Sequence, residues 1–215
     1  MARPGRRLAP IREAVTAERR ILIFLAGPNG SGKSTFFDEY LADLGLPFVN
    51  ADVMARRLRD ARPGSPADEL ERRAFVEAEA IRGAFLEAGI SFCIETVFSD
   101  PYSAKLDFLA RARAAGYAVF LVFIGLDSPQ LSIARVKHRV ATGGHDVPDE
   151  KLISRFPRTL ANLRGGVLLA DEGFLFDNSS VREPYRLVLV YEEGQIVNRF
   201  PPLPSWTAGL PRLTP

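Results

Sequence analysis

Short apolar runs alternate along the chain with longer stretches in which apolar residues recur every three or four positions. The short runs predict buried strands, because parallel strands that are covered on both faces are continuously apolar. We expect strands at 21–26, 46–50, 90–94, 118–124 and 174–176.

The stretches between these runs predict helices, and several have recognisable ends. Ser65 is expected to cap the longest helix, and Gly89 to end it. Ser128 and Pro129 open a later helix, and Pro157 is expected to kink the one after it. We expect helices at 33–44, 53–60, 65–88, 102–115, from 128 onward, and at 149–164. This alternation predicts an α/β fold, with a mainly parallel sheet and helices on both faces.

The two ends of the chain depart from the alternation. Residues 1–20 are basic and interrupted by proline and glycine, which predicts a loose arm with at most a short helix. Residues 185–191 and 196–200 flank a polar turn and predict a C-terminal β-hairpin. The Pro-rich tail, 201–215, is expected on the surface, so the main domain is predicted to span 21–200.

The first strand and the first helix are joined by the motif Gly27-Pro28-Asn29-Gly30-Ser31-Gly32-Lys33-Ser34-Thr35. Its spacing fits G-x-x-x-x-G-K-[ST], the phosphate-binding P-loop. Glycines allow positive φ and let backbone N–H groups approach an anion, and the helix N-terminus favours phosphate. Lys33 is expected to reach the β- and γ-phosphates of ATP, and the Ser34 hydroxyl to bind Mg²⁺.

Two carboxylates end expected strands at the edge where the P-loop lies. Ligands of parallel sheets bind beyond the carboxyl ends of the strands, so Asp52 and Glu95 should converge there. Asp52 is predicted to accept or orient the proton of a substrate hydroxyl; alternatively, it caps the helix 53–60. Glu95 and the adjacent Thr96 are predicted to bind the substrate, with a role for Glu95 near hydrated Mg²⁺ left open. The alternative for Glu95 is an exposed strand-end carboxylate.

Arginines are frequent after the fourth expected strand. Arg135 and Arg139 lie four residues apart on one helix face, and Arg155 and Arg158 follow on the next helix. An arginine supplied in cis stabilises the charge on a phosphoryl group in transfer. We therefore predict that Arg139 and Arg155 contact phosphates and that Arg135 belongs to the nucleotide site. The alternative is a solvated basic face.

The Gly143-Gly144 break between these arginines predicts a lid over about 139–158, which would close over ATP. His138 and His145 are interpreted as structural or solvent-facing, because phosphoryl transfer needs no histidine. Asn178, after the last short strand, is predicted to flank the adenine, with a plain turn as the alternative.

The composition supports one soluble domain: 215 residues, 47% of them hydrophobic and 25% charged. The net charge of 28 − 26 = +2 is too balanced to indicate nucleic acid or an anionic membrane as a partner. Cys93 is the only cysteine, which excludes a disulfide within the chain and a cysteine-based zinc site. No apolar run approaches the length of a membrane span and no signal segment is visible, so we expect a cytoplasmic location.

Six segments together resemble the zeta toxin family of P-loop kinases: 27–35, 50–52, 94–96, 139–148, 155–163 and 177–179. The P-loop alone is widespread, whereas the Gly-Gly-His lid segment with its flanking arginines is much more specific. The resemblance covers about residues 20–180 and implies a three-layer P-loop kinase fold that uses ATP and Mg²⁺.

By this resemblance, Asp52 matches the family's catalytic aspartate and Glu95 a substrate-binding glutamate. Two of the lid-region arginines match those that neutralise the phosphates. Family members that act as toxins phosphorylate the 3′-hydroxyl of the amino sugar in UDP-N-acetylglucosamine. This chain differs from them in having Glu95-Thr96-Val97 in place of Glu-Gly-Thr, and in being shorter. No antitoxin segment can be identified in it, and a possible antitoxin partner cannot be read from the sequence.

The sequence therefore predicts an ATP-dependent kinase that acts on a hydroxyl of a small molecule, with UDP-N-acetylglucosamine as the first acceptor to try. A nucleoside, or an antibiotic of the chloramphenicol or aminoglycoside type, is an alternative acceptor, because acceptor pockets are built from loops. The alternative from another class is a nucleotide-binding regulator with slow hydrolysis, which would not need Asp52.

Overall fold

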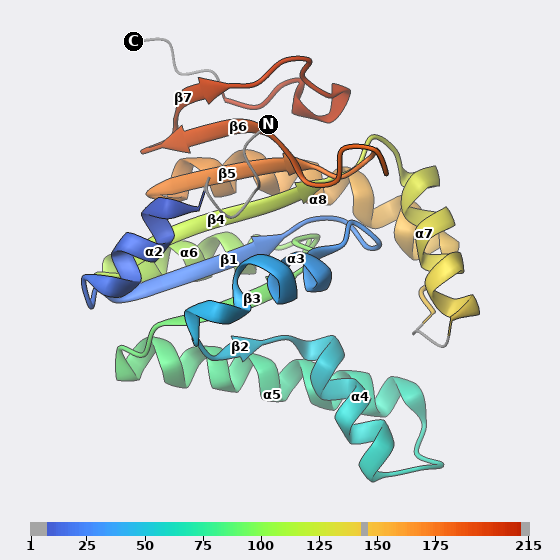
Figure 1. Cartoon of the computed structure of the whole chain (residues 1–215). Helices are drawn as coiled ribbons and strands as arrows, with labels where there is room; N and C mark the ends of the chain where they lie inside the picture. The colour runs from blue at the N-terminus through green and yellow to red at the C-terminus, as the bar shows by residue number, and fades with distance from the viewer. Residues whose placement is uncertain (1–7, 143–145, 212–215) are drawn as a thin grey trace.

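Across residues 8–142 and 146–211, which the computed structural model describes, seven strands form one sheet (Figure 1). Their order is β2–β3–β1–β4–β5–β6–β7. The first five strands of this order are parallel, and β6 and β7 are antiparallel at one edge. The strands span Ile21–Ala26 (β1), Phe48–Val49 (β2), Phe92–Thr96 (β3), Ala118–Gly125 (β4), Glu172–Asp177 (β5), Arg186–Glu192 (β6) and Gln195–Arg199 (β7).

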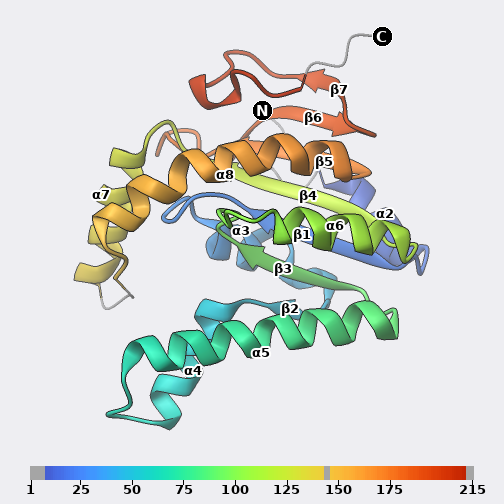
Figure 2. The same cartoon turned by 180° about the vertical axis from the view of Figure 1, so that it is seen from behind.

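Helices cover both faces of the sheet and complete the three layers (Figures 1 and 2). They span Ala9–Thr16 (α2), Lys33–Tyr40 (α3), Ala51–Ala61 (α4), Ala67–Ala88 (α5), Ala104–Ala114 (α6), Pro129–Ala141 (α7) and Asp149–Leu169 (α8), with short 3-10 turns at Ala42–Leu44 and Ser205–Thr207. Helices α2 and α3 lie on one face, and α5, α6 and α8 on the other. Helix α7 lies beyond the carboxyl ends of the strands. The expected three-layer P-loop kinase fold and the C-terminal hairpin are confirmed.

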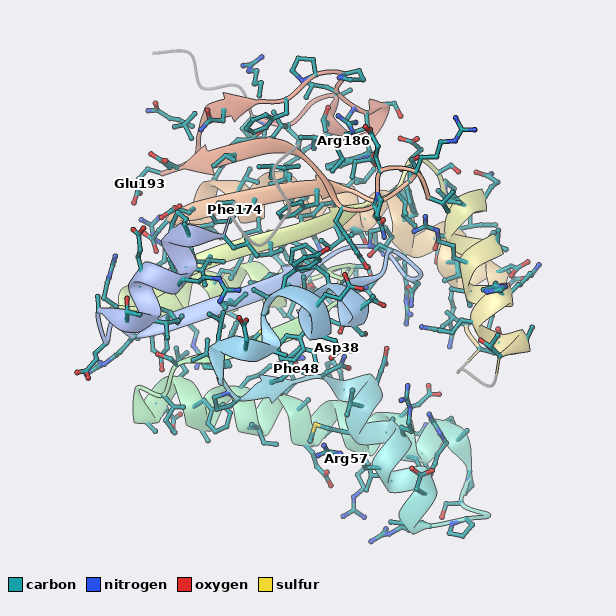
Figure 3. All side chains as sticks on the ribbon, in the orientation of Figure 1. Asp38, Phe48, Arg57, Phe174, Arg186 and Glu193 are labelled. Carbon is teal, nitrogen blue, oxygen red and sulfur yellow. The ribbon has the colours of Figure 1, made fainter. Side chains whose placement is uncertain are left out.

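Each face of the central strands packs its own apolar core. Phe24 of β1 meets Phe98 edge to face beneath α5, α6 and α8, with ring centroids 4.9 Å apart. On the other face, Phe48 of β2 stacks on Phe37 of α3 at 3.7 Å, and Phe174 of β5 joins the same core (Figure 3). Because β1 is buried along its whole length, it fixes the position of the P-loop that follows it.

The N-terminal segment packs more tightly than a loose arm would. Leu8, Ile11 and Ala14, on and just before α2, are buried in the core of the α3 face. The expected short helix is present, but the expectation that the segment is loose is wrong for residues 8–16. The apolar face of α2 covers strands that would otherwise be exposed.

The C-terminal tail also returns to the core, and the expectation that it lies on the surface is wrong at Trp206 and Leu210. Each of these residues exposes 5% of its surface. The Trp206 ring lies over Gly125, where an added Cβ would come within 2.4 Å of it. Its Nε1 donates a hydrogen bond to Asp177 Oδ1 at 3.2 Å. The tail therefore covers the ends of β4 and β5.

The predicted boundaries are close to those observed, and the differences lie mainly at helix ends. Ser128 caps α7 as expected, its Oγ accepting the Leu131 N–H at 3.2 Å. Ser65 does not cap α5, whose N-cap is Pro66 and has no side-chain hydrogen bond. Helix α8 contains Pro157 and extends beyond its expected end. Within the described ranges, no helix is long and apolar enough to cross a membrane.

Replacing Trp206 with alanine tests the role of the tail. We expect Trp206→Ala to lower the free energy of unfolding by about 3 kcal/mol or more, because a large buried ring is removed and a cavity is left. Urea denaturation followed by circular dichroism measures the change. Val181→Ala is the control, because Val181 is 89% exposed and its loss should cost less than about 0.5 kcal/mol. Equal stability of the two variants would contradict this packing.

Candidate active site

The P-loop holds a backbone conformation that requires glycine at three positions. Gly27, Gly30 and Gly32 have φ values of 147°, 70° and 90°. An added Cβ at Gly27 would lie 2.2 Å from the Ile124 carbonyl oxygen, and one at Gly32 would lie 2.7 Å from Tyr185 Oη. Positive φ and close approach thus both select glycine here. The loop leads into α3, whose N-cap is Gly32, so no side chain competes for the first N–H groups.

Side chains from distant parts of the chain hold the outer side of this loop. Asn178 Nδ2 donates to the Ser31 carbonyl at 2.8 Å, and Tyr185 Oη donates to the Gly32 carbonyl at 2.9 Å. Ser132 Oγ on α7 donates to the Asn29 carbonyl at 2.6 Å. These bonds turn loop carbonyls outward. The Asn178 amide thus contacts the loop backbone, and its contact with adenine stays a prediction.

Lys33 is buried at the start of α3, exposing 6% of its surface. Its Nζ donates to the carbonyls of Gly27 and Pro28 at 3.0 Å each, and lies 4.0 Å from Glu95 Oε1. Burial lowers the pKa of Lys33 from its ordinary value, while the negative charges of Glu95 and Asp52 act against this shift. The three charged groups therefore form one electrostatic cluster at the P-loop.

Glu95 is the last residue but one of β3 and faces the P-loop, as predicted. Its Oε2 accepts hydrogen bonds from Ser34 Oγ at 2.9 Å and from Asn50 Nδ2 at 2.7 Å. Burial raises the pKa of Glu95, and the charge of Lys33 opposes that rise. An exposed strand-end carboxylate is therefore the wrong description of Glu95. Glu95 thus contacts Ser34 and also lines the smaller cavity, and its role near Mg²⁺ and its binding of the substrate both stay predictions.

Asp52 lies in the first turn of α4 and does not cap it. The cap is Asn50, whose Oδ1 accepts the N–H groups of Asp52 at 2.8 Å and Val53 at 3.3 Å. The interpretation of Asp52 as the helix cap is therefore wrong. Its exposed carboxylate makes no hydrogen bond or salt bridge to any residue in the described part of the chain. It lines two adjoining cavities instead.

These two cavities, of about 370 Å³ and 640 Å³, meet beside Asp52. Residues that line both include Asp52, Phe75, Val97 and Arg155. The smaller cavity also has Glu95 and Thr96 in its wall, and the larger one has Asn29 of the P-loop. A small molecule in either cavity would have Asp52 beside it, and in the larger cavity it would also have Asn29 of the P-loop beside it.

The four candidate arginines come from α7 and α8 and separate into two pairs. The Arg135 Cβ is packed against Gly30, and the positive charge of Arg139 acts on Lys33, so both lie near the P-loop. Arg155 and Arg158 line the smaller cavity. Contacts of Arg139 and Arg155 with phosphates stay predictions. Of the predicted lid, Gly143, Gly144 and His145 lie outside the described residues.

Helix α8 also holds the loop that follows β3 and walls the smaller cavity. Asn162 Nδ2 donates to the carbonyls of Phe98 and Asp100, each at 3.0 Å, and Thr159 Oγ1 donates to the Val97 carbonyl at 2.9 Å. Thr96 Oγ1 accepts the Phe98 N–H at 3.1 Å, which helps to shape the loop. Binding of substrate by Thr96 stays a prediction.

Sequence reasoning missed several groups at this site. The capping role of Asn50 was not predicted, although asparagine before a helix is a recognisable cap signal. Phe75 is 53% exposed on α5 and lines both cavities. Arg82 and Lys105 lie in the wall of the smaller cavity, and no local pattern distinguishes them from surface cations.

The fold and the P-loop define the chain as a protein with the architecture of P-loop kinases. A family model, AAA_33, described as an AAA domain, matches residues 22–157, and the chain belongs to this family. An uncharacterized protein of Haemophilus influenzae is 26% identical over 149 residues, which are 68% of this chain and 99% of that protein.

Two solved structures show the same fold at low sequence identity. The chain matches the AvrRxo1-ORF1:AvrRxo1-ORF2 complex with a TM-score of 0.64 and 17% identity, covering 86% of this chain and 62% of that one. It matches the PezAT chromosomal toxin–antitoxin system of Streptococcus pneumoniae with a TM-score of 0.59 and 15% identity, covering 88% and 82%. The chain thus spans less than two thirds of the AvrRxo1 chain.

The burial of Glu95 predicts a pH dependence of stability. Its pKa in the folded state is raised above its ordinary value of 4.5, so the folded state holds the proton more tightly than the unfolded state. The stability that this provides is complete below pH 4.5 and is lost as pH rises through the raised pKa. Glu95→Gln has no carboxylate to ionise, so the variant should gain stability relative to the native protein as pH rises from 4.5 through the raised pKa of Glu95.

Urea denaturation of both proteins at several pH values measures this relative gain. Glu69→Gln, at an exposed carboxylate on α5, is the control and should show no such trend. A Glu95→Gln difference that stays constant with pH would contradict the burial of this charge.

Proposed function

We propose that the protein is an ATP-dependent kinase that transfers the γ-phosphate to a hydroxyl of a small molecule. One observation carries the proposal above all. The Asp52 carboxylate lines two cavities, acts electrostatically on Lys33 of the P-loop, and forms no hydrogen bond or salt bridge with any described residue. A phosphotransferase needs a carboxylate at this place to accept the proton of the attacking hydroxyl.

The residues present fit ATP with Mg²⁺. The glycines form a cradle in which a Cβ would clash, and the α3 N-terminus is uncapped, both of which suit phosphate oxygens. Ser34 is exposed and its hydroxyl donates a hydrogen bond to Glu95, so these two side chains would supply the oxygen ligands that hold the ion. Mg²⁺ is commonly held in this way, by one or two protein groups with waters and phosphates. When bound, it neutralises charge on the β- and γ-phosphates.

Each group of the site then has a role. The P-loop N–H groups and Lys33 bind and orient the phosphates. Asp52 accepts the proton of the acceptor hydroxyl as its oxygen attacks. Arg139 and Arg155 stabilise the negative charge that develops on the transferred group. The helices that carry these arginines exclude water when they close over the site.

The acceptor that we propose first is UDP-N-acetylglucosamine, on the basis of the zeta toxin resemblance. Similarity to the PezAT structure supports the fold only, at 15% identity, so an antitoxin partner remains a proposal as well. The alternative acceptors, a nucleoside or an antibiotic, remain open to the same assay. A nucleotide-binding regulator with slow hydrolysis is less well supported, because it would not need the Asp52 carboxylate that lines both cavities.

Asp52→Asn tests the proposal directly. The variant keeps the shape of the side chain and removes the base, so transfer should fall by about 10²-fold or more, a typical effect for general-base catalysis. ATP consumption with and without candidate acceptors measures it. Asp60→Asn, at an exposed position in the last turn of α4, is the matched control and should be fully active. Full activity of Asp52→Asn would contradict the kinase proposal and favour a nucleotide-binding regulator with slow hydrolysis.

The arginines are tested in the same assay. Arg139→Ala and Arg155→Ala should each lower kcat by about 10³-fold, the scale of a lost arginine finger. Arg57→Ala is the control, because Arg57 is exposed on α4 and lines neither cavity (Figure 3). An effect of about tenfold or less would assign that arginine to the solvated face instead.

A further inference from the structure

Two carbonyl groups of the P-loop accept hydrogen bonds from side chains that lie far along the chain. Asn178 Nδ2 donates to the Ser31 carbonyl at 2.8 Å, and Tyr185 Oη donates to the Gly32 carbonyl at 2.9 Å. Asn178 and Tyr185 follow β5, well beyond residue 157, where the segment matched by the family model ends. A Cβ at Gly32 would lie 2.7 Å from Tyr185 Oη and 2.9 Å from Asn178 Nδ2. The loop and this distant segment are therefore in close contact.

The geometry of the peptide bond gives these two contacts a consequence for the N–H groups of the loop. The Ser31 carbonyl shares a peptide unit with the Gly32 N–H, and the Gly32 carbonyl shares one with the Lys33 N–H. In a planar trans peptide the C=O and the N–H point in opposite directions. Holding both carbonyls outward therefore turns both N–H groups inward, where a phosphate would lie. Neither N–H donates a hydrogen bond to any residue in the described part of the chain.

The two side chains are themselves held in place. Asn178 Oδ1 accepts the Tyr185 N–H at 3.2 Å, so both ends of the Asn178 amide are engaged. The buried Tyr185 ring packs against Phe36 and Tyr40, with ring centroids 5.2 Å and 5.9 Å away. Burial raises the pKa of Tyr185 to about 12, while a hydrogen bond with Thr35 opposes this rise. The hydroxyl therefore keeps its proton near neutral pH and remains a donor.

We propose that Asn178 and Tyr185 are positioning residues, which hold two neighbouring N–H groups of the P-loop ready for the phosphates of a nucleotide. Donors that are oriented before the ligand arrives bind an anion more tightly, because less ordering is needed on binding. This inference rests on the proposed function, since it needs a nucleotide on the P-loop, but it does not depend on the acceptor. It gives Asn178 a role through the loop backbone instead of a contact with adenine.

Tyr185→Phe tests the proposal, because it removes the hydroxyl and keeps the packed ring. The protein is titrated by calorimetry with a non-hydrolysable ATP analogue in the presence of Mg²⁺. We expect the Kd of the analogue to rise by about threefold to tenfold, the range that one neutral hydrogen bond contributes.

Tyr117→Phe is the matched control for this variant. The Tyr117 hydroxyl also donates to backbone carbonyls, those of Phe85 and Ile90 at 2.9 Å each, and none of these residues lines either cavity. Tyr117→Phe should lose stability in urea to an extent comparable with Tyr185→Phe, and should bind the analogue like the native protein.

This comparison separates positioning from a purely structural role. Lower stability of Tyr185→Phe with an unchanged Kd would match the control and overturn the proposal. Transfer of phosphate that still requires Asp52 would in that case leave the kinase standing. An analogue that fails to bind the native protein would overturn the inference and the proposed function together.

Asn178→Ala is measured with two ligands, because loss of an adenine contact would also weaken the binding of ATP. Tripolyphosphate with Mg²⁺ is the second probe, since it has the phosphates and no base. We expect both probes to bind about tenfold more weakly, because the variant loses its hydrogen bonds to Ser31 and to the Tyr185 N–H. Asn198→Ala, at an exposed position of β7, should bind both probes like the native protein. Weaker binding of the ATP analogue alone, or of neither probe, would contradict the role of Asn178 in the loop.

Discussion

The site depends on a buried pair of opposite charges, Lys33 and Glu95. The burial of Lys33 is compensated by two hydrogen bonds to loop carbonyls and by the Glu95 carboxylate, which lies 4.0 Å from its Nζ. Glu95 in turn is stabilised by Ser34 and Asn50. The parallel register of β1 and β3, which aligns Leu25 with Glu95, sets the distance between them. A shift of this register would separate Glu95 from Lys33, so the charge pair depends on how β1 pairs with β3.

Around this pair, the cleft is assembled from segments that are far apart in sequence. Asn178 and Tyr185, which follow β5 in the chain, donate hydrogen bonds to P-loop carbonyls, and Ser132 of α7 does the same. Helix α8 carries Arg155 into the cleft and holds the carbonyls of the loop after β3 through Asn162. Movement of α8 would therefore move the wall of the smaller cavity together with an arginine of the predicted lid.

The parts of the site that could be predicted are those with local patterns. The P-loop is contiguous, and Asp52 and Glu95 follow from the rule that strand ends converge at one edge. The hydrogen bond of Tyr185 to the P-loop, and the places of Arg82 and Lys105 in the cavity wall, depend on how segments distant in sequence pack. The spacing of residues along the chain does not indicate this packing. The buried ends of the chain were missed for a related reason: α2 has only 8 residues, and Trp206 lies among prolines that suggest a surface tail.

The fate of the γ-phosphate tests the central claim most directly. The protein is incubated with ATP labelled at this phosphate, Mg²⁺ and a small-molecule extract of cells, and the labelled products are separated. Because Asp52 lines both cavities, we expect the label in an organic phosphate ester, and none there when Lys33→Ala replaces the native protein. Label found only in inorganic phosphate, with every extract tried, would contradict the account.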